Sequence, residues 1–198
     1  MNALVASFKV YWQKRILAML ALGFSAGLPL LLVFGTLSFW LRKEGVDRTT
    51  IGFISWVALF YGLKFLWAPL VDHLRLPLLA RLFGQRRSWL LLAQCGVLLS
   101  LFAMGNIDPQ QHLEQLVLLA LVVAFSSATQ DIALDAWRIE SAPTEEQAAM
   151  AASYQLGYRL GMILAGGGAF SLAHFYGWSV AYQVMAGFML IGIVTSLL

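Results

Sequence analysis

Long apolar segments alternate with short polar ones along this chain. Six apolar segments can be delimited, at about residues 15–41, 51–70, 88–104, 116–137, 148–170 and 178–198. An α-helix needs about 20 predominantly apolar residues to cross the hydrocarbon core of a bilayer. The pattern therefore predicts an all-α membrane protein with six transmembrane helices.

Proline and glycine mark two of these segments. Pro29 lies in the middle of the first segment, where it removes a backbone hydrogen bond and bends the helix. The sequence is compatible both with a bend beside an internal space and with a bend that serves only packing. The fifth segment contains glycines that permit close helix contacts, and packing is their favoured explanation. They are Gly157, Gly161, Gly166, Gly167 and Gly168.

Several local features refine this pattern. Thr49 or Thr50 is expected to cap the second helix. The amphipathic stretch 74–83, between the second and third segments, is expected to lie in the membrane surface. Cys95, the one cysteine of the chain, lies within an apolar segment and is expected to be a packed, inert thiol.

Composition supports a membrane location. The chain has 198 residues, of which 60% are hydrophobic and 12% charged, whereas soluble domains carry about 25% charged residues. The net charge of +3 is too small to indicate a nucleic-acid partner.

Basic residues indicate the orientation of the chain. Eight of the 13 Lys and Arg residues fall on the side of the N-terminus and of the second and fourth loops. Three fall on the other side, and two lie within spans. The positive-inside rule therefore places the N-terminus in the cytoplasm. The eight are Lys9, Lys14, Arg15, Arg75, Arg81, Arg86, Arg87 and Arg138, and the three are Arg42, Lys43 and Arg48.

The last residues of the chain are still apolar, and no polar tail follows them. Six spans are typical of one repeat of a larger transporter. We therefore expect residues 1–198 to form an N-terminal six-helix transmembrane bundle, with a C-terminal six-helix half missing from this sequence.

Three charged residues lie well inside the spans: Lys64, Asp131 and Arg159. A charge that faces lipid is costly, by about 2.5–3.5 kcal/mol on insertion scales, so such residues usually face a partner or a cavity. From the helical rise, Lys64 and Asp131 lie at similar depth on parallel helices, so an ion pair between them is possible. Arg159 is interpreted as a substrate-anion or proton-pathway residue, or as the structural partner of Asp131 or of a carboxylate in the missing half.

Asp131 and Asp135 are four residues apart and share one helical face, a spacing that also occurs in metal-binding helices. Pairing of Asp135 with Arg138, or with the loop at Arg86 and Arg87, is the simpler expectation. No zinc-protease motif, phosphate-binding glycine loop or CxxC pair is present in the sequence. We therefore predict no metal, no cofactor and no catalytic residue.

The connection between the second and third segments carries a first resemblance. Asp72, followed by a basic loop that ends Gly84-Gln-Arg-Arg87, is similar to the signature of major facilitator transporters. That signature is usually tighter, and Ala68 stands where its first glycine would be.

A more specific resemblance lies in the fourth segment. Ala128-Thr-Gln-Asp-Ile-Ala-Leu-Asp-Ala-Trp-Arg138, with Glu140, resembles the helix-four signature of the AmpG muropeptide permeases and of the related acetyl-coenzyme A transporters. The stretches 23–29, 64–72 and 158–161 also resemble that family. The resemblance covers essentially the whole chain and implies the N-terminal half of a major facilitator transporter.

The resemblance implies a function that composition does not. AmpG-like permeases import anhydromuropeptides (GlcNAc-anhydroMurNAc peptides) across the inner membrane for peptidoglycan recycling, driven by protons. The implied partners are this substrate, protons, the bilayer and the missing half. Substrate or proton-pathway residues would be Lys64, Gln130, Asp131 and Arg159, and a cytoplasmic gate would comprise Asp72, Arg86, Arg87, Asp135 and Arg138. Asp131 leads as the proton carrier, because low dielectric favours a neutral carboxyl group.

Other functions remain open. One is transport of acetyl-coenzyme A or another solute by the same superfamily. Another is a membrane-embedded, metal-dependent transferase, since Asp131-x-x-x-Asp135 resembles half of the CDP-alcohol phosphotransferase motif, although its other half is absent upstream. A non-transporting scaffold is the third. The favoured reading is a transporter and not an enzyme.

Overall fold

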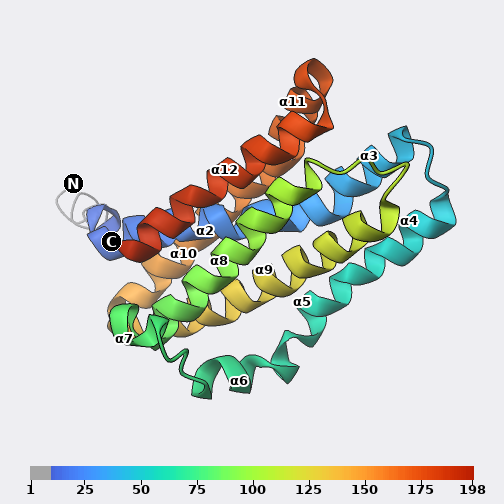
Figure 1. Cartoon of the computed structure of the whole chain (residues 1–198). Helices are drawn as coiled ribbons and strands as arrows, with labels where there is room; N and C mark the ends of the chain where they lie inside the picture. Colours follow the sequence, from blue (N-terminus) through green and yellow to red (C-terminus); the bar gives the residue numbers. More distant parts are fainter. Residues whose placement is uncertain (1–9) are drawn as a thin grey trace, which may run out of the picture.

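The computed structural model describes residues 10–198, and the regular elements in this part of the chain are all helical (Figure 1). Lys9, one of the cations counted above, lies outside the described residues. A short 3₁₀ turn, Val10–Trp12, precedes the first long helix.

The first span is a continuous helical run with one irregular turn. It consists of α2 (Lys14–Leu31), a π-helical turn (Leu32–Thr36) and α3 (Leu37–Lys43). Together they form a candidate membrane span of 30 residues, which confirms the predicted first helix. Pro29 is buried, and the Tyr182 hydroxyl donates a hydrogen bond of 2.7 Å to the carbonyl of Leu32 in the π-helical turn.

The second span is shorter and less regular than the predicted segment 51–70. It comprises α4 (Arg48–Ile54), a 3₁₀ turn (Ser55–Ala58), α5 (Leu59–Leu63) and a second 3₁₀ turn (Lys64–Leu66). The candidate span ends at Leu66, and α6 (Ala68–His73) follows as a separate helix with Pro69 in its first turn. Proline suits the start of a helix because it lacks an N–H donor.

The N-cap residue of α4 differs from the one predicted from the sequence. Asp47, and not Thr49 or Thr50, occupies the N-cap position and accepts a hydrogen bond from the Thr50 amide. Helix α4 therefore begins at Arg48, two or three residues earlier than a threonine cap allows. A carboxylate is a strong N-cap and also interacts favourably with the positive end of the helix dipole.

The remaining helices complete the bundle. They are α7 (Leu79–Phe83), α8 (Gln85–Met104), α9 (Leu113–Ser141), α10 (Thr144–Ile163), α11 (Ala169–Tyr176) and α12 (Trp178–Leu197), with a π-helical turn at Leu164–Gly168 between α10 and α11. Within the described residues, five helical runs are long and apolar enough to span a membrane. The run from Thr144 to Tyr176 covers the predicted segment 148–170 but is not among the five, since Arg159 and its glycines lower its hydropathy.

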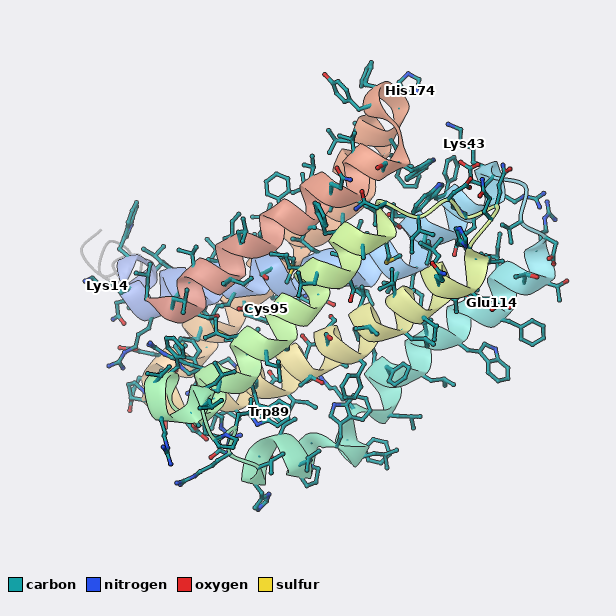
Figure 2. The ribbon with its side chains drawn as sticks, viewed as in Figure 1. Lys14, Lys43, Trp89, Cys95, Glu114 and His174 are labelled. Carbon is teal, nitrogen blue, oxygen red and sulfur yellow. The ribbon has the colours of Figure 1, made fainter. Side chains whose placement is uncertain are left out.

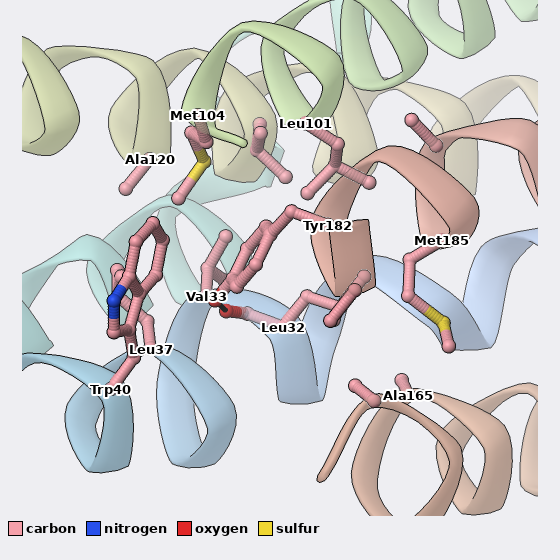
Figure 3. Packing of buried hydrophobic residues seen from close by; sticks show 14 of the residues in the cluster. Leu32, Val33, Leu37, Trp40, Leu101, Met104, Ala120, Ala165, Tyr182 and Met185 are labelled. Carbon is pink, nitrogen blue, oxygen red and sulfur yellow. Dashed lines mark hydrogen bonds between the residues drawn. The ribbon is translucent and has the colours of Figure 1, made fainter. Parts of the chain in front are cut away.

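Helix α2 lies at the centre of the bundle, packed against α10, α12 and α9. Helix α8 pairs with α9 and α12, whereas the α4–α6 segment runs along the outside of α9 (Figure 1). The main core forms where the first, third, fourth and sixth spans meet, and Tyr182, Trp40 and Met104 lie within it (Figure 3).

Glycines bring α2 and α10 into direct backbone contact. A Cβ atom at Gly23 would lie 2.3 Å from the carbonyl oxygen of Tyr154, and one at Gly27 would lie 2.1 Å from that of Tyr158. In return, a Cβ at Gly157 would lie 2.1 Å from the carbonyl oxygen of Leu20. Gly157 thus has the packing role expected for the glycines of the fifth segment, and the glycines of α2 have the same role against α10.

Helix α8 carries both buried polar and exposed side chains. Gln94 is fully buried, and its side-chain oxygen accepts a hydrogen bond of 3.0 Å from Ser196 of α12. Cys95, in contrast, is exposed on the surface of the bundle (Figure 2), so the prediction of a packed thiol is wrong. Core and lipid are both apolar, so the sequence does not reveal which helical face is buried.

Candidate transport pathway

Asp131 is the central charged residue of the candidate pathway. It lies on α9, between fully buried Gln130 and buried Ile132, and its own side chain is largely enclosed. The Tyr154 hydroxyl of α10 donates a hydrogen bond to Asp131 Oδ1 over 3.4 Å. The rings of Tyr154 and Tyr158 lie 5.9 Å apart, so α10 presents two phenol groups on the side of the carboxylate.

Lys64 approaches Asp131 from the second span without contacting it. Lys64 lies in the 3₁₀ turn between α5 and α6 and is half-buried. Its charge acts on the Asp131 carboxylate, but residues 10–198 contain no ion pair of 4.0 Å or less between the two. The ion pair that the sequence allows between Lys64 and Asp131 is therefore not formed in this structure. Helical rise gives the height of a residue along the axis but not the direction of its side chain around the axis.

Trp67 connects the second span to α9 near Lys64 and Asp131. Its indole N–H donates a hydrogen bond of 3.1 Å to Thr129 Oγ1. The Trp67 ring also lies 5.1 Å from that of Phe125, and Phe60 completes the aromatic cluster. Because Trp67 comes three residues after Lys64, this attachment fixes the position of the lysine relative to Asp131.

Gln130 and Tyr61 carry buried polar atoms without protein partners. Both the amide nitrogen and the amide oxygen of Gln130 lack a hydrogen-bond partner among the described residues, and so does the Tyr61 hydroxyl. An unsatisfied buried amide costs about 1–3 kcal/mol, so such groups usually have a functional explanation or an ordered water. Both lie near Asp131 in the fold, Gln130 as its neighbour in sequence and Tyr61 within reach of its charge.

Arg159 is separate from this cluster. Its side chain is exposed on α10, and within the described part of the chain it forms no ion pair with Asp131 or another carboxylate. The structure thus contains no pair between Arg159 and Asp131, and a pair with a carboxylate of the missing half stays a prediction. Its proposed place in the pathway stays a prediction.

A second charged cluster lies at the end of the bundle where α8 begins and α9 ends. The Arg86 guanidinium contacts Asp72 at 2.5 Å and Glu140 at 2.8 Å, which joins α6, α8 and α9. Asp135 pairs with Arg138 at 3.6 Å, one of the two partners expected for it. Arg87 is half-buried beside Arg86.

Sequence reasoning did not assign functional contacts to Glu140 or Tyr154. Glu140 was visible as part of the helix-four signature, but its contact with Arg86 bridges residues 54 positions apart. Nothing in the sequence singled out Tyr154 as a candidate site residue, because a tyrosine in an apolar segment is not unusual. Among residues 10–198, no group of three or more His, Cys, Asp or Glu side chains is arranged to hold a metal ion.

An all-helical bundle with five apolar spans, and with ionisable groups enclosed between them, defines an integral membrane protein. The chain belongs to the transporter family whose sequence model is described as Acetyl-coenzyme A transporter 1, which matches residues 15–175.

Individual relatives show which members of this family the chain resembles. The chain is 44% identical over 191 residues to the anhydromuropeptide permease of Escherichia coli K12, a match that covers 96% of this chain and 38% of the permease. It is 38% identical over 180 residues to a Rickettsia felis protein named as transporter AmpG 4, covering 90% of this chain and 43% of that protein. An uncharacterized protein of Haemophilus influenzae is 36% identical over 191 residues.

These relatives confirm the resemblance to the AmpG permeases that the helix-four signature indicated. The chain spans less than half the length of the relatives it matches. Its family assignment therefore concerns the matched region, which includes Lys64, Asp131 and the Arg86 cluster.

Proposed function

We propose that this chain forms the N-terminal half of a proton-coupled importer of anhydromuropeptides in the inner membrane, with the N-terminus in the cytoplasm. The observation that carries the proposal is the Asp131–Tyr154 contact inside a membrane span of a chain 44% identical to an anhydromuropeptide permease. In this proposal the protein is a transporter and not an enzyme, and residues 144–176 are the fifth of six transmembrane helices of a major facilitator half.

Asp131 serves as the proton carrier of the proposed cycle. A carboxylate enclosed between helices needs a cation, hydrogen-bond donors or a proton to offset its desolvation. Here it has one long hydrogen bond and the charge of Lys64 at a distance beyond an ion pair. Its protonation state can therefore respond to water entering from either side and to movement of Lys64.

The substrate in this proposal is an amphiphilic sugar peptide with carboxylate groups. Lys64 and Arg159 supply cations on the second and fifth spans, and the unpartnered amide of Gln130 supplies a donor and an acceptor. In transporters of this class the substrate lies near the bilayer midplane, between two repeats. A second six-helix half would complete the path, with these residues along its inner side.

The Arg86 cluster serves as the cytoplasmic gate of this cycle. Asp72, Arg86 and Glu140 connect α6, α8 and α9 through contacts between side chains that are partly exposed. Asp135, Arg138 and Arg87 lie at the same end of the bundle. Partly exposed ion pairs have small net energies, so they break readily when helices move. The excess of basic residues at this end supports its cytoplasmic location.

Uptake by the full-length protein tests the proposal. Right-side-out vesicles that contain the protein should accumulate labelled anhydromuropeptide, and a protonophore should abolish the accumulation. Asp131→Asn should remove uptake at an unchanged protein level. Asp108→Asn, the same chemical change in the exposed loop before α9, is the matched control and should transport normally. Full uptake by Asp131→Asn contradicts the proposed role of Asp131.

Acetyl-coenzyme A is the second candidate substrate, because the matching family model carries that name. The same vesicles distinguish the two substrates. Excess unlabelled anhydromuropeptide should compete with labelled anhydromuropeptide, and excess acetyl-coenzyme A should not. Accumulation of labelled acetyl-coenzyme A, with no uptake of anhydromuropeptide, favours the second candidate.

A further inference from the structure

A cavity of about 610 Å³ lies at the end of the bundle where α2 and α8 begin and where α9 and α12 end. Both described termini lie at this end (Figure 1). Neither Asp131 nor Lys64 lines the cavity, so it is distinct from the candidate transport pathway. Its volume falls within the roughly 300–1,000 Å³ of small-molecule sites.

The rim of the cavity is basic. Lys14 and Arg15 at the start of α2, and Arg87 at the start of α8, all line it. Among the described lining residues none is acidic, and none of the three cations forms an ion pair within residues 10–198. Arg15 donates one hydrogen bond of 2.9 Å to the carbonyl of Ser141, which holds its guanidinium across the end of α9.

The interior of the cavity is apolar. Leu17 and Ala21 of α2 line it, three and seven residues after Lys14, which places them about 4.5 and 10 Å deeper along the helix. Leu90 of α8 lies one turn beyond Arg87 and continues the same wall. Trp137 adds an indole ring, the side chain typical of membrane interfaces. The cations thus lie at the end of the helices, and the apolar walls lie further along them.

We propose that this cavity binds one anionic phospholipid, with the phosphate among Lys14, Arg15 and Arg87 and the upper acyl chain along Leu17 and Ala21. Cations without a carboxylate partner attract a phosphate group. An apolar wall makes no favourable contact with a soluble anion, whereas it can pack against an acyl chain. The lipid contacts all four helices and therefore stabilises their packing at this end.

Lipid retention by the purified full-length protein tests the site. Native mass spectrometry in detergent, with phosphatidylglycerol titrated against phosphatidylethanolamine, should show one selectively retained phosphatidylglycerol. Each cation near an anionic lipid contributes about fivefold in affinity, so Lys14→Gln with Arg87→Gln should weaken retention about 30-fold. Arg75→Gln with Arg81→Gln, an equal charge change at exposed positions outside the cavity, should leave retention unchanged.

A steric variant tests the same site without changing its charge. Ala21→Phe fills the apolar part of the cavity and should reduce phosphatidylglycerol retention while all three cations remain. A scan of thermal unfolding identifies any variant that does not fold. Equal retention of the two lipids, or retention unaffected by both the double variant and Ala21→Phe, overturns the proposal. Displacement of phosphatidylglycerol by excess inorganic phosphate also overturns it, since the site would then recognise the free anion.

Discussion

Thr36 Oγ1 donates a hydrogen bond of 2.9 Å to the backbone carbonyl of Ala165, and each residue belongs to a π-helical turn. One turn interrupts the first span and the other connects α10 to α11. Both residues are buried, so the bond links two irregular turns inside the bundle. π-helical turns are frequent at functional sites, and here they face each other in the two helical runs that also share the glycine contacts.

Removing the Thr36 hydroxyl should destabilise the protein. Thr36→Val keeps the shape of the side chain but leaves the Ala165 carbonyl without this donor. Hydrogen bonds between membrane helices contribute about 0.6 kcal/mol on average and up to about 1.7 kcal/mol, so we expect a loss in this range. Unfolding in mixed detergent micelles measures it.

Thr195→Val is the matched control for this prediction. The Thr195 hydroxyl bonds only to the Ile191 carbonyl of its own helix in the described structure, so its loss should change the free energy of unfolding little. Equal effects of the two substitutions would show that the link between the π-helical turns adds no stability.

Adding one methyl group at a glycine contact should destabilise the protein more than removing the Thr36 hydroxyl. In Gly157→Ala the new methyl group meets the Leu20 carbonyl oxygen at 2.1 Å, so α2 and α10 must separate. Overpacking costs about 1–3 kcal/mol even where flexible side chains can adjust, and a backbone neighbour adjusts less. We expect a strong loss of monodisperse protein in gel filtration. Gly167→Ala, with no atom within 4 Å of its new methyl group, should behave as the unchanged protein.

Apolar segment length predicted the spans because bilayer thickness sets the length of a spanning helix. It succeeded for residues 15–41 and 88–104, where the helices are continuous. For 51–70 it predicted a span that the structure confirms at Arg48–Leu66, but it placed the end four residues too late, because Leu70 belongs to the separate helix α6. It also did not determine burial, as exposed Cys95 and buried Gln94 demonstrate.

Charges within the spans identified part of the candidate site. A charge in an apolar segment is conspicuous, so Lys64 and Asp131 were found from the sequence. Tyr154 was missed because the sequence does not predict which side chain on α10 faces a carboxylate on α9. The sequence also left open whether Lys64 and Asp131 form an ion pair, since helical rise gives height but not direction around the axis.

The Asp47 cap predicts a local dependence on pH. Hydrogen bonds from the Thr50 hydroxyl and then from its amide hold the pKa of Asp47 below its ordinary 3.8. Because the folded pKa is the lower one, the stability from this cap is complete above about pH 3.8 and is lost as pH falls through the folded value. The start of α4 should therefore open at low pH.

Hydrogen exchange of the Thr50 amide, compared with that of amides in the same α-helix beyond the first turn, measures this opening. Asp47→Ser keeps a capping oxygen but has no carboxylate, so its relative protection should not change between pH 5 and pH 3. A fall in relative protection that persists in Asp47→Ser would assign the pH dependence to another group.

The two ion pairs at the end of α9 differ in geometry but not in exposure. Arg86 and Glu140 make contacts of 2.8 and 3.0 Å with side chains 22% and 55% exposed, whereas Arg138 and Asp135 meet at 3.6 Å with side chains 27% and 54% exposed. Exposed pairs contribute about 0.2–1 kcal/mol. We expect the Arg86–Glu140 coupling near the upper limit and the Arg138–Asp135 coupling near the lower. Double-mutant cycles with alanine measure both, and equal couplings contradict the role of geometry.

Tyr154→Phe separates proton coupling from substrate binding. The substitution keeps the ring against Tyr158 but removes the one described hydrogen-bond donor to Asp131, which contacts it at 3.4 Å. A hydrogen bond to a charged group contributes about 1.5–3 kcal/mol, and this long one should lie at the low end, so uptake driven by a pH gradient should fall about tenfold. Labelled anhydromuropeptide uptake into vesicles measures this rate.

Exchange of substrate across the same vesicles without a gradient distinguishes the cause of that fall. Exchange needs no net proton release, so Tyr154→Phe should retain it if the hydroxyl acts through Asp131. Tyr158→Phe, one helical turn further along α10 and without a described hydrogen bond to Asp131, should keep both activities. Equal loss of driven uptake and of exchange in Tyr154→Phe would instead place the Tyr154 hydroxyl in substrate binding, because both processes require the bound substrate to cross.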